Sequence, residues 1–317
     1  MSTPPTTKPD RRWHDLSGRD LSIGALGVTV VLWASAFVGI RDAADSFSAG
    51  PLSLGRLVVA TVVLTVLARP WRHRLPAGRP LLLLILAGVT WFGAYNVALN
   101  AGEQQVDAGT AALVVTVGPI LIALFAGILL KEGFPKPLLI GIAVAASGVV
   151  LISLSTRDES AVDTASTTGV LLCLAAALLY AIGALAQKPT LTVVTPVMSV
   201  WLMCVVGAVV CLPYLPSLVR ETGDASTANI VWVIYLGVFP TAIGFSTWSY
   251  ALKRLSAGQV ASATYLVPAV ATLISWVMLD EVPAALAFVG GGLCLIGVAI
   301  TRYRRRGPVA ASPDPAG

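Results

Sequence analysis

The hydrophobic positions of this chain fall into long runs that are separated by polar residues, glycine and proline. A helix of about twenty apolar residues is long enough to cross the roughly 30 Å hydrocarbon core of a bilayer. Five runs in the first part of the chain cover residues 21–40, 51–68, 80–99, 109–130 and 137–155. Five more cover residues 168–187, 196–215, 229–250, 257–279 and 283–302. The pattern predicts an all-α integral membrane protein with ten transmembrane helices.

The longest polar stretch between two runs, TRDESAVDTAST, divides the chain into two halves. We therefore expect five segments, which are an N-terminal tail (1–20), a first five-helix unit (21–155), a linker (156–167), a second five-helix unit (168–302) and a C-terminal tail (303–317).

Composition supports a membrane location, because 56% of the residues are hydrophobic, 12% are charged, and the mean hydropathy is +0.83. The net charge is +5, and the basic residues are distributed along the chain as the predicted topology requires. If both termini are cytoplasmic, 17 of the 21 basic residues lie on the cytoplasmic side, as the positive-inside rule requires. We therefore expect a multi-pass cell-membrane protein with a cytoplasmic N-terminus, a cytoplasmic C-terminus and an extracytoplasmic linker. The basic excess is then a topology signal and does not indicate nucleic-acid binding, although the RYRRR segment suits contact with anionic lipid.

The two halves are related by an internal repeat. A shift of 149 residues places the segment AGTAALVVTVGPILIALFAGILLKE (108–132) on AGQVASATYLVPAVATLISWVMLDE (257–281), so that Pro119 falls on Pro268 and Glu132 on Glu281. Glycines 141 and 148 fall on glycines 290 and 297, and both glycine pairs predict close helix packing. Because each repeat has five helices, the second must enter the membrane from the opposite side, which predicts inverted-topology repeats.

Each repeat places a proline in the middle of its fourth helix. Pro119 should free the carbonyl of Val115, and Pro268 should free the carbonyl of Thr264. A freed carbonyl at membrane depth must be covered by protein or must line a water-filled cavity. Carriers built from inverted repeats place their substrate site at such interruptions. The alternative is that each proline is a structural kink or hinge without ligand contact.

These features together resemble the EamA branch of the drug/metabolite transporter superfamily. The resemblance rests on WASAF (33–37), the arginine in GPLSLGR (50–56), the duplicated proline and glutamate, and the glycines that follow them. It implies a ten-helix permease that moves small metabolites, often outward, with amino acids and related compounds frequent among its substrates.

Aromatic and polar side chains near the middle of the runs are the candidate substrate-binding residues. Together with the cation and the two prolines, the candidates are Trp33, Arg56, Trp91, Tyr95, Asn96, Thr116, Pro119, Tyr180, Thr241, Thr264, Tyr265 and Pro268. Trp91 and Tyr95 share one helix face, and Asn96 and Asn100 lie one residue further round. An aromatic cavity with hydroxyl and amide groups suits a neutral, zwitterionic or amphipathic solute. The alternative for each aromatic residue is simple packing.

Three charged residues allow more than one interpretation. Arg56 lies inside the second helix, where it could attract a substrate carboxylate, pair with an outer acid such as Asp42 or Glu103, or snorkel to the headgroups. Glu132 and Glu281 each precede a helix that starts with proline, and could cap that helix or act in gating.

Motifs that the sequence lacks reduce the number of possible functions. There is no GxxxxGK[ST] motif, the four cysteines lack metal-ligand spacing, and no Asp, Glu or His lies near a helix midpoint. We therefore expect no enzyme activity, no cofactor and no metal. The leading hypothesis is a secondary, non-ATP exporter of small metabolites such as amino acids or their derivatives, working by alternating access. The alternative is an exporter of multiple drugs or cationic compounds. The expected partners are a small-molecule substrate and membrane lipid, with a homodimer as one option for assembly.

Overall fold

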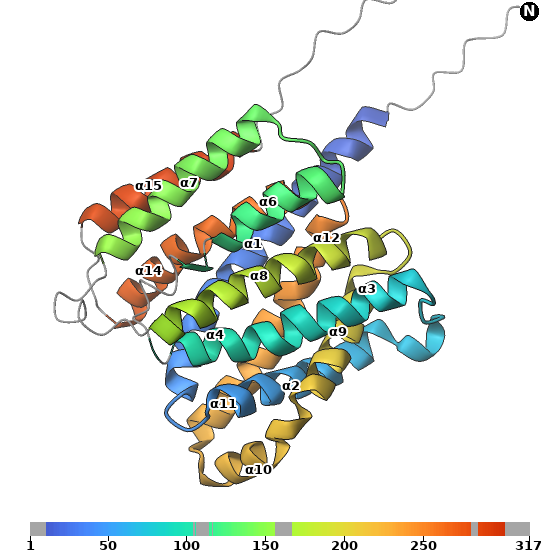
Figure 1. Ribbon diagram of the computed structural model, residues 1–317, viewed down its shortest axis with the longest axis vertical. Helices are drawn as coiled ribbons and strands as arrows, with labels where there is room; N and C mark the ends of the chain where they lie inside the picture. The colour runs from blue at the N-terminus through green and yellow to red at the C-terminus, as the bar shows by residue number, and fades with distance from the viewer. Residues whose placement is uncertain are drawn as a thin grey trace, which may run out of the picture.

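The computed structural model describes residues 11–103, 105, 114–115, 117–155, 167–279 and 285–301. Within these ranges the chain forms helices joined by short turns, and no strand occurs. The all-α prediction is confirmed for this part of the chain. Figure 1 shows the helices lying alongside one another as a bundle.

The first half contributes long helices and one pair of helices with a π-helical segment between them. The elements are α1 (Arg11–Ala43), α2 (Ala49–Ala68), a 3₁₀ turn (Pro70–Arg72), α3 (Arg79–Ala87), the π-helix η2 (Gly88–Ala94), α4 (Tyr95–Glu103), α6 (Val117–Leu129) and α7 (Lys136–Ser155). Helix α1 starts ten residues before the predicted apolar run, because residues 11–20 contain no proline.

The second half repeats this order and adds one amphipathic helix. The elements are α8 (Thr167–Thr190), α9 (Pro196–Cys211), a 3₁₀ turn (Leu212–Tyr214), α10 (Leu215–Asp224), α11 (Thr227–Leu236), the π-helix η5 (Gly237–Gly244), α12 (Phe245–Leu252), α13 (Ala257–Ser262), the 3₁₀ turn η6 (Ala263–Tyr265), α14 (Leu266–Leu279) and α15 (Ala285–Thr301). The hydrophobic pattern missed α10, because that helix is mostly polar. Its residue Glu221 accepts hydrogen bonds from the backbone N–H and the hydroxyl of Ser48, and so caps the start of α2.

Five of the described segments are long and apolar enough to cross a membrane. They are Ala49–Arg72, Arg79–Gly102, Thr167–Thr190, Pro196–Asp224 and Thr227–Leu252, and shorter apolar helices accompany them. Large apolar side chains face outward on several helices, and Val62, Leu82 and Leu295 are each more than 60% exposed. Such surfaces are costly in water and suit lipid. The protein is therefore a multi-pass membrane protein.

The two π-helices occupy equivalent places in the repeat. Segment η5 begins at Gly237, 149 residues after η2 begins at Gly88, and both interrupt a helix that enters the core. A π-helix widens the turn and leaves backbone carbonyls without their usual partner, so it is frequently found at functional sites. The sequence pattern did not reveal these segments, because a π-turn has no hydrophobic period that distinguishes it from an α-helix.

The two halves pack against each other through equivalent pairs of helices. Helix α2 packs on α9 and η5, and α9 packs on η2. Helix α7 lies against α15, as the upper left of Figure 1 shows. At Gly148 an added Cβ would overlap the backbone of Cys294, and at Gly297 it would overlap the backbone of Gly141. The predicted close packing at these glycines is confirmed.

Candidate substrate cavity

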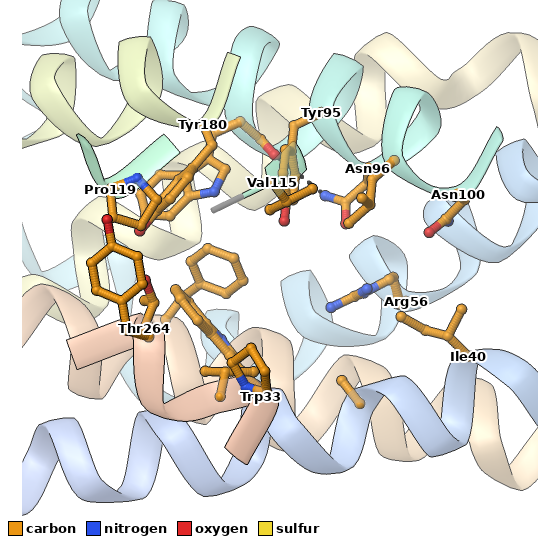
Figure 2. A pocket seen from close by; sticks show the side chains of 17 residues that line it. Trp33, Ile40, Arg56, Tyr95, Asn96, Asn100, Val115, Pro119, Tyr180 and Thr264 are labelled. Atoms are coloured by element: carbon orange, nitrogen blue, oxygen red, sulfur yellow. Dashed lines mark hydrogen bonds between the residues drawn. The ribbon is translucent and has the colours of Figure 1, made fainter. Parts of the chain in front are cut away.

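A cavity of about 150 Å³ lies between the halves, near the middle of the bundle (Figure 2). Ten of the twelve residues predicted for the site line it, namely Trp33, Arg56, Trp91, Tyr95, Asn96, Pro119, Tyr180, Thr264, Tyr265 and Pro268. Of the other two, Thr241 is buried behind Arg56, and Thr116 lies outside the described residues.

Aromatic rings form one wall of the cavity. Trp91 is 1% exposed, and its ring centroid lies 5.1 Å from that of Tyr180 and 5.0 Å from that of Phe245. Gly183 of α8 permits this approach, because a Cβ there would overlap the Trp91 side chain. Interlocked rings hold one another in fixed orientations, so this wall is preformed for an apolar group.

Trp33 is fixed by the second π-helix. Its indole Nε1 donates to the carbonyl of Pro240 at 3.3 Å, and its ring stacks on Trp248 with centroids 5.1 Å apart. Pro240 lies within η5, so the carbonyl that accepts this bond belongs to the π-helix. The π-helix of one half therefore orients an aromatic residue of the other.

Arg56 is a buried cation in the cavity wall. It is 6% exposed, and its Nε donates to the hydroxyl of Thr241 at 3.0 Å. That hydroxyl donates in turn to the carbonyl of Leu236 at 2.7 Å, one π-turn earlier. The snorkelling interpretation does not fit this arrangement, because the buried side chain bonds to Thr241 of η5, whereas a snorkelling side chain extends out of the bundle. A cation at this depth favours an anionic group in the cavity.

Two amides lie beside Arg56. Asn96 and Asn100 of α4 are 6% and 5% exposed, and both line the cavity. In Figure 2 they occupy the same end of the cavity as Arg56, whereas Trp33, Tyr180 and Thr264 lie toward the other end. The cavity therefore has a polar end and an aromatic end.

Both proline-containing segments reach the cavity. Pro119 and Val115 line it from the first half, and Pro268 and Thr264 line it from the second. Before Pro268 the helix tightens into the 3₁₀ turn η6, which separates α13 from α14. The prolines thus lie where a ligand can contact the altered backbone.

At the opposite end of the bundle, Glu132 and Lys188 join the halves. The Glu132 carboxylate accepts from the backbone N–H of Ala257 at 2.8 and 3.0 Å and lies 3.8 Å from Lys188 Nζ. Lys188 Nζ also donates to the carbonyls of Leu252 and Leu255. The expectation that Glu132 caps the next helix is wrong. Pro135 and Pro137 leave that helix short of N–H donors, and α13 packs beside α6. Glu281 lies outside the described residues.

Sequence reasoning did not propose several small or apolar residues that line the cavity. Ala36 and Ile40 follow Trp33 along the same face of α1, and Leu99 and Val267 are further lining residues. Helical register could have found the first two. The others look like ordinary core positions. Among the described residues, no group of three or more His, Cys, Asp or Glu side chains could hold a metal ion.

A cavity lined by both halves of an apolar helical bundle fits the architecture of a membrane carrier. Comparison with known families gives the same class, because two parts of the chain, residues 22–154 and 167–303, match the model of the EamA-like transporter family. The chain belongs to this family, whose members are transporters and not enzymes.

Individual relatives extend over nearly the whole chain. The chain is 39% identical to a "Probable terminal-alkyne amino-acid exporter" of Streptantibioticus cattleyicolor, over 90% of this chain and 95% of that protein. It is 32% identical to the uncharacterized transporter YdfC of Bacillus subtilis, over 85% and 87% of the two chains. A solved crystal structure matches with a TM-score of 0.72 at 19% identity, covering 90% of this chain and 98% of that chain, which bears on the fold alone.

Proposed function

We propose that this transporter exports small amino-acid-like metabolites as a secondary carrier. The observation that carries the proposal is the cavity itself, in which a buried arginine lies at one end and an aromatic wall at the other. The arginine suits a carboxylate, and the aromatic wall suits an apolar side chain. The relative from Streptantibioticus cattleyicolor, named as an amino-acid exporter, supports the same substrate class.

We further propose ten transmembrane helices in two inverted repeats, residues 21–155 and 168–302, with both termini in the cytoplasm. The equal spacing of the two π-helices and the exchanged packing of α2 on η5 and α9 on η2 support this arrangement. The polar end of the cavity is then nearer the outer side, and the Glu132–Lys188 cluster is on the cytoplasmic side. Alternating access requires that cluster to separate when the cavity opens inward.

A multidrug or cation exporter is the second candidate. The aromatic wall favours it, because aromatic faces bind organic cations. Arg56 opposes it, because a buried cation repels a cationic substrate. None of the described residues that line the cavity is acidic, so none offsets this repulsion. The two candidates therefore differ in whether the cavity binds a carboxylate-bearing solute or an organic cation.

Proteoliposomes distinguish these candidates. Purified protein should move L-phenylalanine or L-leucine faster than empty vesicles, and should move a cationic dye no faster than the vesicles do. Trp91→Ala should slow amino-acid flux about tenfold or more, because it opens the aromatic wall. Dye flux without amino-acid flux would select the second candidate, and a broad panel without any protein-dependent flux would contradict both.

A further inference from the structure

At the polar end of the cavity, the hydrogen bonds of two asparagines determine which way their side-chain amides are oriented. This orientation determines which polar group of a substrate can bind there. Asn96 Nδ2 donates to the carbonyl of Phe92 at 2.8 Å and points toward the carbonyl of Trp91 at 3.4 Å. Backbone carbonyls can only accept, so the NH₂ group of Asn96 must face them. Both carbonyls belong to the π-helix η2, and Asn96 lines the cavity, so Oδ1 is the amide atom left to face the cavity.

Asn100 has the same orientation for a different reason. Its Nδ2 donates to Ser53 Oγ at 3.1 Å and lies 3.3 Å from the carbonyl of Ala49. The Ser53 hydroxyl gives its own hydrogen to that carbonyl at 2.8 Å, so toward Asn100 it can act only as acceptor. The structure records no hydrogen bond to Oδ1 of either asparagine within the described residues.

The resulting polar end combines one cation with two fixed acceptors. Asn96 and Asn100 are four residues apart on one face of α4, and Arg56 faces the same end of the cavity in Figure 2. An α-amino acid carries a carboxylate and an ammonium on the same carbon, and so needs a cation and acceptors side by side. Its carboxylate offsets the charge of Arg56, and its ammonium needs neutral acceptors, because none of the described lining residues is acidic.

We propose that Asn96 and Asn100 hold the α-ammonium group of the substrate through their side-chain oxygens, while Arg56 holds the carboxylate. This assignment rests on the proposed function and adds a specificity to it. The site selects zwitterionic α-amino acids and rejects acids in which the ammonium is removed, acylated or replaced by hydroxyl. A substrate without the ammonium leaves buried acceptors unpaired, and a lost hydrogen bond to a charged group corresponds to about 10- to 100-fold in affinity.

The test is competition in proteoliposomes that take up labelled L-phenylalanine. Unlabelled L-phenylalanine should compete at least about tenfold better than L-phenyllactate, 3-phenylpropionate or N-acetyl-L-phenylalanine. Asn100→Leu should weaken competition by phenylalanine alone. The four compounds should then compete with more similar affinities. Asn100→Asp should raise competition by phenethylamine, which has the ammonium and no carboxylate, and so gives a gain that a folding defect cannot produce.

Asn229→Leu is the matched control, because Asn229 of α11 bonds Ser46 and does not line the cavity. It should keep the wild-type order of competitors. Equal competition by phenyllactate and phenylalanine in the wild type, or an unchanged order in both Asn100 variants, overturns the assignment while amino-acid transport stands. Absence of any amino-acid binding or flux in the wild type contradicts the proposed function, and this assignment with it.

Discussion

Arg56, Asn96 and Asn100 line the polar end of the central cavity, and Glu132 and Lys188 connect the ends of α6, α8, α12 and α13. Both ends contain partly or fully buried polar groups, and both are built from the two halves of the chain. At the Glu132–Lys188 end the described groups bond to one another and to the backbone. We call this cluster the joint, because it holds the two halves together. At the cavity end, no hydrogen bond to the two asparagine oxygens is recorded within the described residues.

The comparison shows that burial of a charge does not by itself indicate a binding site. Lys188 is oriented by two carbonyls and one carboxylate, all supplied by the chain. Arg56 is oriented through Nε by Thr241, and its side chain lies in the cavity wall. The cavity end is marked as a candidate site by the two asparagine oxygens, to which no bond is recorded within the described residues, and not by the burial of Arg56.

The largest expected effect comes from removing the cation at the cavity end. Arg56→Met should lower the kcat/KM of amino-acid transport by at least about 30-fold, because a charge-assisted bond to the carboxylate is lost. Flux in proteoliposomes measures this. Arg220→Met is the matched control, since Arg220 is exposed on α10, and it should leave transport unchanged. Equal loss in both variants would contradict a specific role for Arg56.

A smaller effect is expected from loosening the joint. Glu132→Gln weakens the bonds to Ala257 and removes the charge beside Lys188, which should favour opening of that end by about 1 kcal/mol, or roughly fivefold. A cysteine at Val260, fully buried on α13, reports the opening through its rate of maleimide labelling when the four native cysteines are replaced.

The matched control for the joint is Glu221→Gln, which makes the same chemical change at the cap of α2 on the opposite side. It should leave labelling at position 260 unchanged. If Glu132→Gln labels at the wild-type rate, Glu132 is a helix cap without a role in holding this end closed.

The smallest effect should come from the residue behind Arg56. Thr241→Val removes the acceptor for Arg56 Nε and the donor to Leu236, so the guanidinium loses part of its orientation. We expect the apparent KM for amino acids to rise about three- to tenfold with little change in maximal rate. Thr241→Ser keeps the hydroxyl and should behave as wild type. A similar KM in Val and Ser variants would show that Thr241 only packs.

Much of the lining of the candidate cavity followed from the sequence, because its signals are local. Trp91 and Tyr95 share a helix face by spacing, and the two prolines stand out within apolar runs. The bonding of Arg56 could not be predicted, because Thr241 lies 185 residues away and reaches it only when η5 packs on α2. Glu132 was assigned to the wrong helix for the same reason, since α13 approaches it only through packing between halves.

The sequence by itself determined that the chain is a helical membrane protein with an internal repeat, because hydrophobic run length and duplicated residues are properties of the linear chain. Only the tertiary structure decided where the helices widen into π-turns and which way the asparagine amides face. Those features depend on hydrogen bonds between groups that packing brings together, and a pattern of polar and apolar positions carries no information about the direction of a bond.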